Sequence, residues 1–194
     1  MKKIILIVAL LASLLILWLN LGTNIVGKNT LTATNISTAI KQNEIQFGIP
    51  IRLNIPKLGV TANVEAVALD IKNNMDVPQK VEDVGWYKLG VKPGEKGNAV
   101  IDGHYDDITG APVVFYNLIS LQVGDPIETV DNNGKKLTFI VQKKANYAYN
   151  QFPLLEVFGQ SNGKNLNLIT CSGTWDKNNK TYADRLVIYS TLKE

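Results

Sequence analysis

The sequence predicts a mainly β fold: a closed seven- to eight-stranded β-barrel with one or two short helices, preceded by an N-terminal transmembrane helix. Segments of strand length, apolar or alternating with period two, follow one another from about Ile49 to the end of the chain. Turn residues such as Asn133-Gly134 separate them. Many short strands divided by turns are typical of closed or nearly closed barrels. The N-terminal helix is expected because the chain starts with an apolar run of membrane-spanning length.

The transmembrane prediction depends on the segment from Ile4 to Leu21. These 18 residues carry no charge and follow Lys2 and Lys3. A helix of this length extends about 27 Å, close to the roughly 30 Å of a bilayer core. The two lysines favour a cytoplasmic N-terminus, which places the rest of the chain outside the cell. A cleaved signal peptide is the alternative, but Leu31-Thr32-Ala33 is a poor match to a small-x-small cleavage site.

Residues 22–48 predict a linker or stalk, because they are rich in Asn, Thr and Ser and show little periodicity. Within them, residues 36–45 could form a short helix with Ser37 as its cap. We therefore expect three parts: an anchor at 1–21, a linker at 22–48 and a catalytic β-barrel domain at 49–194.

The first strands of the barrel domain are expected at 51–55, 60–69 and 98–103. Residues 60–69 alternate, so that every second side chain faces the same way. Residues 98–103 form a short apolar run, which indicates a central strand. Residues 79–87, between these strands, are expected to include one helical turn.

The second half begins with residues 113–121, whose apolar positions are closer to the spacing of a helix. Strands follow at 126–130 and 137–149, joined by the turn at Asn133-Gly134. Two further strands are expected at 166–171 and 185–192. Residues 172–184 between them predict a 13-residue loop, long enough to be functional.

Composition excludes some classes of protein. The net charge of +3 is mild and not clustered, so no nucleic-acid partner is expected. The chain contains one cysteine and therefore cannot form an internal disulfide. A lone thiol in an exported protein is either reactive or paired with another molecule, or else it is a buried structural residue, and the composition leaves these open.

The single histidine and the single cysteine both lie where predicted strands run into loops. His104 follows the strand at 98–103, Cys171 ends the strand at 166–171, and Arg185 begins the last strand. A thiolate attacks acyl carbons, an imidazole exchanges protons with leaving and incoming groups, and a guanidinium stabilises developing negative charge. These three candidate catalytic residues are the smallest set for covalent acyl transfer. Taken singly, a lone histidine is often structural, and an arginine at a strand start is often a surface charge.

The motifs around these residues resemble those of one family. Segment 168–171, Leu-Ile-Thr-Cys, is similar to the Thr-Leu-x-Thr-Cys signature of sortases, with Asn167 at the first position. Segments 103–104, 115–118 and 124–125 resemble the stretch that follows the sortase histidine, and Arg185 sits where the family places its arginine. The resemblance covers residues 50–191. The run at 171–176, with Tyr182 and Asp184, most resembles the classes called E and F.

The resemblance to sortases implies an eight-stranded barrel in which His104, Cys171 and Arg185 share one groove. It implies a cysteine transpeptidase of the cell membrane, with a single span and an extracellular catalytic domain. Cys171 would cleave the Thr–Gly bond of a Leu-Pro-x-Thr-Gly-like sorting signal on a surface protein and form a thioester. An amine from a cell-wall precursor or a pilin lysine would then resolve the thioester.

The same resemblance places Thr170 against the substrate or the oxyanion, as a substrate-binding residue. It implies no cofactor. Some sortases bind calcium through acidic residues of barrel loops, and Asp106 with Asp107 is a candidate pair. Two carboxylates are too few for the six or more oxygens that calcium takes, so we expect no required metal.

Two other functions use the same residues. An exported cysteine peptidase or an L,D-transpeptidase-like cross-linker would also need the thiol. Papain-like peptidases, however, place the cysteine before the histidine, and segment 170–173 lacks the His-Gly-Cys cluster of the cross-linkers. A non-catalytic surface-binding barrel would make Cys171 a core residue and His104 incidental.

Overall fold

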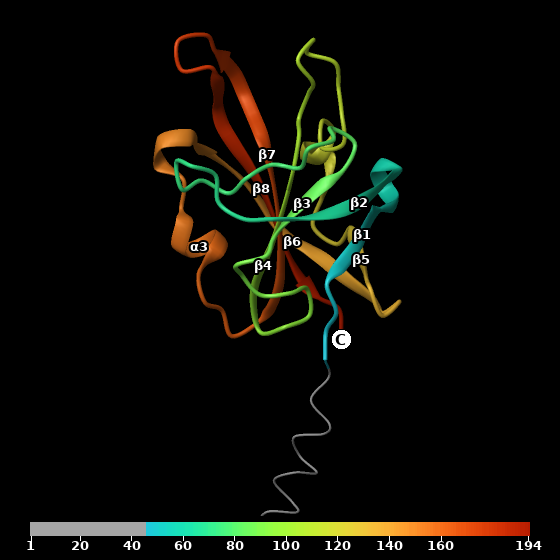
Figure 1. The fold of residues 1–194 in the computed structure, drawn as a ribbon. Helices are drawn as coiled ribbons and strands as arrows, with labels where there is room; N and C mark the ends of the chain where they lie inside the picture. Colours follow the sequence, from blue (N-terminus) through green and yellow to red (C-terminus); the bar gives the residue numbers. More distant parts are fainter. Residues whose placement is uncertain (1–45) are drawn as a thin grey trace, which may run out of the picture. The chain divides into compact units, whose positions relative to one another are not determined.

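Eight strands close into a barrel in the computed structural model, which describes residues 46–194 (Figure 1). Their order around the barrel is β1-β2-β3-β4-β7-β8-β6-β5, and β5 pairs with β1 to close it. The strands are β1 (Pro50–Ile55), β2 (Val60–Val67), β3 (Val84–Tyr87), β4 (Gly97–Gly103), β5 (Pro126–Asp131), β6 (Lys136–Ala148), β7 (Lys164–Asp176) and β8 (Thr181–Leu192). The prediction of a mainly β, closed barrel is confirmed.

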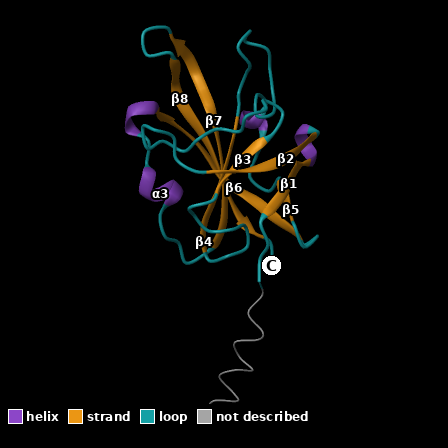
Figure 2. Ribbon diagram, viewed as in Figure 1, coloured by secondary structure: helices purple, strands orange, loops and turns teal. Residues whose placement is uncertain are grey.

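Helices in the described part are short and lie in the connections between strands (Figure 2). Three are 3₁₀ turns: η1 (Pro56–Leu58), η2 (Leu118–Ser120) and η3 (Tyr149–Gln151). One is a five-residue α-helix, α3 (Leu154–Phe158), which the sequence pattern did not predict. Both η3 and α3 belong to the connection between β6 and β7.

Two strand pairs, β2–β3 and β4–β7, are parallel, and the other neighbours in the barrel are antiparallel. Parallel neighbours need a long crossover, because the chain must return to the starting end. Residues 68–83 make that crossover between β2 and β3 without a helix or strand of their own. The helical turn expected within 79–87 is wrong. The Asp83 N–H donates to the Lys80 carbonyl in a simple turn, and β3 follows at once.

Alternation along the strands divides the apolar side chains between two clusters. The larger cluster fills the barrel and includes Ile101, Leu168 and Ile188. The residues next to these in the chain, Val100, Ile169 and Val187, belong to a second cluster on the outer face. Side chains from 147–158, including Val157 of α3, complete this second cluster. The sheet formed by β4, β7 and β8 is therefore covered on both faces.

The α-helix suggested by the spacing in residues 113–121 does not form. These residues make turns followed by η2, and the fully buried ones are Phe115, Leu118 and Leu121. Their spacing of three residues is the period of a 3₁₀ turn, whose side chains at i and i+3 lie above one another. The segment directs these three side chains into the barrel core.

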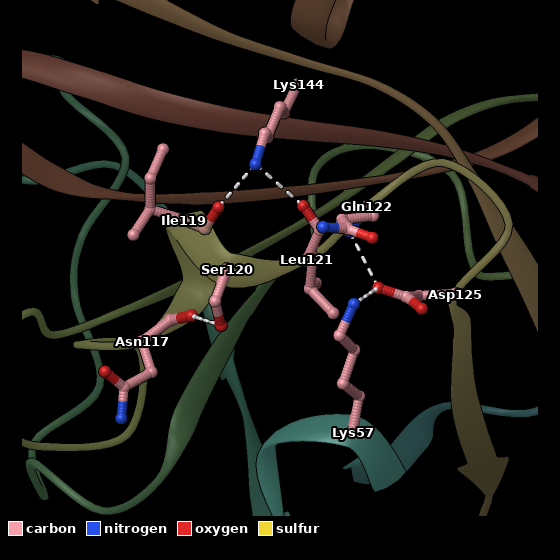
Figure 3. A network of polar contacts seen from close by, with 8 residues as sticks. All are labelled: Lys57, Asn117, Ile119, Ser120, Leu121, Gln122, Asp125 and Lys144. Carbon is pink, nitrogen blue, oxygen red and sulfur yellow. Dashed lines mark hydrogen bonds and ion pairs between the residues drawn. The ribbon is translucent and has the colours of Figure 1, made fainter.

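A polar network fixes η2 and the start of β5 to the barrel (Figure 3). The Lys144 amine, from β6, donates to the carbonyls of Ile119 and Leu121 at 2.6 and 2.9 Å. Asp125 accepts from the Lys57 amine and from the Gln122 N–H, both at 2.7 Å. Lys144 thus satisfies carbonyls at the end of η2 that have no partner within the turn itself.

The predicted 13-residue loop at 172–184 is instead mostly strand. β7 continues to Asp176 and β8 starts at Thr181, so only residues 177–180 form the turn. The pairing shifts between Ser172 and Trp175, and Gly173 there has a φ of 79°, which glycine tolerates. The Asp176 carboxylate closes the turn by accepting the N–H groups of Asn178 and Asn179. Polar composition alone suggested a loop because it does not reveal a bulged hairpin.

Several predictions concern residues outside the described range. These are the transmembrane helix at 1–21, the short helix at 36–45 and most of the linker at 22–48. Between residues 46 and 194, no helix has the length and apolar character needed to cross a bilayer. Residues 47–194 form one compact unit.

Gly103, the last residue of β4, provides a test of the packing next to His104. A Cβ at this position would lie 2.6 Å from the buried ring of Phe115. Gly103→Ala should therefore lower the free energy of unfolding by about 1–3 kcal/mol, the usual cost of overpacking a core. Urea unfolding of the full chain in detergent would measure the change. If Gly103→Ala is as stable as the wild type, the Phe115 ring can move aside at little cost and the packing here is not tight.

Candidate active site

Three adjacent strands bring the predicted catalytic residues together. β4 and β7 are parallel with Asp102 opposite Ile169, and β7 and β8 are antiparallel with Cys171 opposite Arg185. β4 ends at Gly103, and His104 follows it directly. Extending the parallel register by two residues beyond its last pair puts His104 next to Cys171, in one row with Arg185 across strands that are about 4.8 Å apart.

This row lies on the outer face of the barrel. Cys171 follows Ile169 by two residues and Arg185 precedes Val187 by two, so their side chains share the face of the outer cluster. The His104 ring contacts residues 68–83, the segment whose Met75 packs against the same cluster. The strand ends expected at Cys171 and Arg185 are wrong, because both residues lie within longer strands. Strand pairing holds both backbones in place.

The His104 imidazole is oriented by the crossover between β2 and β3. Its Nε2 lies 3.1 Å from the carbonyl oxygen of Pro78. A carbonyl only accepts hydrogen bonds, so Nε2 carries the hydrogen. Nδ1 is then the ring nitrogen that can take a proton from a thiol or give one to a leaving amine.

The Cys171 thiol lies in a partly buried position between opposing influences. Burial raises the pKa of Cys171 above its ordinary value, the Arg185 charge opposes this rise, and Asp106 and Asp102 add to it. Because burial is the largest effect, the resting thiol is mostly protonated at neutral pH. Formation of the nucleophile then needs a proton acceptor, and the adjacent row position holds His104.

The Arg185 guanidinium is fixed by its own strand. One of its terminal nitrogens donates to the carbonyls of Tyr182 and Asp184, at 3.1 and 2.9 Å. The other donates to the Thr181 hydroxyl at 2.9 Å, and the Tyr149 ring centroid lies 5.0 Å from the guanidinium carbon. Among the described residues these bonds leave two of five N–H groups for a substrate oxygen. The guanidinium charge thus lies close enough to the Cys171 thiol to lower its pKa, and two of its N–H groups remain available to a substrate.

Thr170 faces the other side of the sheet from Cys171. Its side chain is buried, and its hydroxyl donates to the Gly103 carbonyl at 2.8 Å. This bond joins β7 to β4 directly behind the Cys171 and His104 positions. The structure thus gives the Thr170 side chain a contact that aligns the two strands, and the substrate-binding role stays a prediction.

Asp102 is a residue of the site that the sequence analysis missed. It precedes His104 by two residues on β4, and its Oδ1 atom is buried without a hydrogen-bond partner. Burial raises the pKa of Asp102 well above its usual range, and the nearby Asp76 and Glu65 carboxylates contribute to the rise. The signal was available, because an acid interrupts the otherwise apolar run at 99–103. The site therefore contains a carboxyl group that favours its neutral form.

Aromatic side chains connect the β7–β8 hairpin to the loop after His104. Tyr105 packs against Tyr116 and Tyr182, and Trp175 packs against the other side of Tyr182. The Tyr182 hydroxyl donates to Asp106, a bond that raises the pKa of Tyr182 to about 12. The contacts fix the loop at 104–112 relative to β8.

The two aspartates considered for calcium have separate partners. Asp106 accepts from Tyr182, whereas Asp107 accepts from the N–H groups of Thr109 and Ala111 in its own turn. Across residues 46–194, no three His, Cys, Asp or Glu side chains gather as a metal site would require.

Comparisons with known proteins agree with this geometry. A family model described as Sortase domain matches residues 53–193. A search of curated protein sequences returns no match.

Three solved structures illustrate the likeness in fold. Sortase C-1 from Actinomyces oris aligns with a TM-score of 0.58 and 20% identity, over 74% of this chain and 73% of its own. A lid mutant of sortase A from Corynebacterium diphtheriae aligns with a TM-score of 0.57 and 19% identity, over 79% and 74%. A Clostridium perfringens sortase D5 transpeptidase aligns with a TM-score of 0.53 and 22% identity, over 82% and 89%.

The Thr170 contact predicts a specific loss of stability. Thr170→Val removes the buried donor and leaves the Gly103 carbonyl without it, which should cost about 1–3 kcal/mol of unfolding free energy. Thr170→Ser keeps the hydroxyl and should lose less. Ser120→Ala is the control, because it removes an exposed hydroxyl that also donates to a carbonyl. If urea unfolding shows that Thr170→Val loses no more unfolding free energy than Ser120→Ala, the proposed role of this bond is wrong.

The pKa of Cys171 predicts the pH dependence of its alkylation, because only the thiolate reacts. The rate with iodoacetamide should rise with pH, with a midpoint above that of an ordinary cysteine. Arg185→Gln should move the midpoint higher, since it removes the charge that stabilises the thiolate. The single cysteine lets intact-mass measurements follow this one site. A midpoint below the ordinary cysteine value would mean that Arg185 outweighs burial.

Proposed function

This chain belongs to the sortase family, and we propose that it works as a membrane-anchored cysteine transpeptidase with His104, Cys171 and Arg185 as its catalytic residues. The observation that supports the proposal is the pairing of Cys171 with Arg185 on β7 and β8, with His104 directly after the end of β4, the strand on the other side of β7. A nucleophile, a proton carrier and a fixed positive charge are what acyl transfer through a thioester needs.

The first half of the reaction forms the acyl-enzyme. The Cys171 thiol gives its proton to Nδ1 of His104, and the thiolate attacks the carbonyl carbon of the scissile peptide. A C–S bond forms as the carbonyl π electrons move to oxygen, and the free N–H groups of Arg185 stabilise that oxyanion. The oxyanion collapses, the C–N bond breaks, and His104 returns the proton to the leaving amine.

The second half transfers the acyl group. An incoming amine attacks the thioester carbonyl and loses a proton to His104. Collapse of this second oxyanion breaks the C–S bond, leaves the new amide and releases the Cys171 thiolate, which takes back a proton from His104 and restores both groups. His104 takes up a proton and passes it on in each half of the reaction, which suits a ring whose Nε2 is held by Pro78 and whose Nδ1 has no hydrogen-bond partner among the described residues.

The proposed substrate is a surface protein with a Leu-Pro-x-Thr-Gly-like sorting signal, cleaved between Thr and Gly. The proposed acceptor is an amine of a cell-wall precursor or a pilin lysine. We propose that residues 1–21 anchor the chain in the membrane with the barrel outside the cell, supported by Lys2 and Lys3 before the apolar run. The run at 171–176, with Tyr182 and Asp184, supports an E- or F-like subclass.

An assay of product partition tests the reaction type. The full chain in detergent should cleave a Leu-Pro-x-Thr-Gly peptide. When an amine is added, the amide product should increase and the hydrolysed acid should decrease. Cys171→Ala should abolish both products and keep the fold. Arg185→Lys should lose most activity, because an ammonium does not reproduce the planar guanidinium held by three hydrogen bonds.

The outcomes separate the alternatives. Hydrolysis that is unaffected by added amine would identify an exported cysteine peptidase. Binding of a surface ligand with no cleavage and an unreactive Cys171 would identify a non-catalytic barrel. Near-full turnover by Arg185→Lys would remove the guanidinium from the mechanism.

A further inference from the structure

We propose that Glu65 is a positioning residue for His104, acting through the peptide group between Pro78 and Gln79. The inference rests on the proposed function, because it assigns His104 the role of proton carrier. It adds a carboxylate that does not touch the imidazole and lies outside the row of catalytic residues.

The inference rests on two hydrogen bonds made by one peptide group, one through its carbonyl and one through its N–H. The carbonyl of Pro78 accepts the hydrogen bond from His104 Nε2 at 3.1 Å. The N–H of the same peptide group, on Gln79, donates to Glu65 Oε2 at 3.1 Å. Because a peptide group is planar, its carbonyl and N–H point in fixed, nearly opposite directions. A hydrogen bond to the N–H therefore also sets the direction of the carbonyl.

Glu65 is well placed to hold this peptide group. It lies on β2 opposite Gly85 of β3, and Gly85 lies opposite Asp102 of β4, two residues before His104. The crossover has no helix or strand of its own, and its backbone bonds within residues 68–76 leave the stretch around Pro78 to other contacts, of which the bond from the Gln79 N–H to Glu65 is one. Pro78 is buried while Val77 and Gln79 on either side are exposed, which marks Pro78 as the point where the crossover meets the barrel.

The chemical consequence is a defined tautomer of His104. With Nε2–H donated to Pro78, the neutral ring presents the lone pair of Nδ1 to the reaction. Hydrogen bonds in a chain strengthen one another, so an N–H that donates to a carboxylate makes its own carbonyl a better acceptor. Glu65 thus stabilises one tautomer and one ring orientation without an ion pair to the imidazole.

The test of Glu65 has to account for the other charged and titratable groups near His104. Asp102 and Asp106 lie two residues on either side of His104, and both influence the pKa of Cys171, as does Arg185. Asp76, in the same crossover as Pro78, influences the pKa of Asp102. Glu65→Ala leaves these residues in place but removes a charge that acts on Asp102. Glu65→Gln removes the same charge and keeps an acceptor for the Gln79 N–H, so the comparison of the two variants separates the hydrogen bond from the charge. Glu82→Ala is a matched control, because it removes one exposed carboxylate near the same crossover.

The experiment uses the fact that the chain contains one histidine. Nitrogen-15 NMR of the ¹⁵N-labelled full chain in detergent reports the tautomer of that ring directly, with no need for activity. The wild-type neutral ring should be the Nε2–H tautomer. Glu65→Ala should give a mixture of tautomers and lower kcat by roughly 10-fold, less than the 10²- to 10⁴-fold expected for losing the acid–base group itself, with little change in KM.

A conservative variant distinguishes positioning from stability. Glu65→Gln keeps an oxygen that can accept from Gln79, so it should restore the tautomer and most of kcat. The Glu82→Ala control should match the wild type. An unchanged tautomer in Glu65→Ala, even in a less stable protein, would overturn the proposal.

The tautomer of His104 in the wild-type protein is a test of the proposal by itself. If its neutral ring is the Nδ1–H tautomer, the proposal fails even when no Glu65 variant folds. If the ring has the expected tautomer and responds to Glu65→Ala, but the wild type transfers no acyl group, the positioning role stands and the proposed function fails.

Discussion

The register of β4, β7 and β8 is the constraint on which the rest of the structure depends. The antiparallel pairing of β7 with β8 puts Cys171 opposite Arg185, and the parallel pairing of β4 with β7, extended past the end of β4, puts His104 in the same row. A slip of one residue would turn a side chain to the opposite face, so the row exists only in this register. The apolar clusters on both faces and the bond from Thr170 to Gly103 hold it there.

Burial of the row has an electrostatic consequence. The same packing that fixes Cys171 raises the pKa of its thiol, and only the neighbouring guanidinium counteracts the effect among the groups that influence it. Arg185 is in turn held by backbone carbonyls of β8, and His104 is held by the Pro78 carbonyl. In the proposed mechanism the thiolate forms as His104 accepts the thiol proton, so that proton transfer and attack are coupled. The fold orients all three residues, and it places the positive charge of Arg185 where it lowers the pKa of Cys171.

The sequence predicted the barrel because alternation with turns is a local signal. It singled out His104, Cys171 and Arg185 as candidates because of their residue types and their place beside predicted strands, although Cys171 and Arg185 lie within longer strands than expected. It did not predict the hairpin at 172–184, since a glycine bulge in a polar segment looks like a loop. It treated 113–121 as helix-like, although burial every third residue produced η2. It missed Asp102, Tyr149 and the link from Glu65 through Pro78, because these depend on contacts between distant segments. Their importance is visible only when the crossover at 68–83 is placed on the barrel.

The most direct test of this account is to capture the covalent intermediate. The full chain is mixed with a Leu-Pro-x-Thr-Gly peptide, quenched in acid during turnover and measured by intact mass and peptide mapping. The account predicts an added mass equal to the acyl portion ending at Thr, attached to Cys171 and removed by hydroxylamine. Turnover of the peptide with no adduct, or with an adduct on another residue, would contradict the role of the row in acyl transfer.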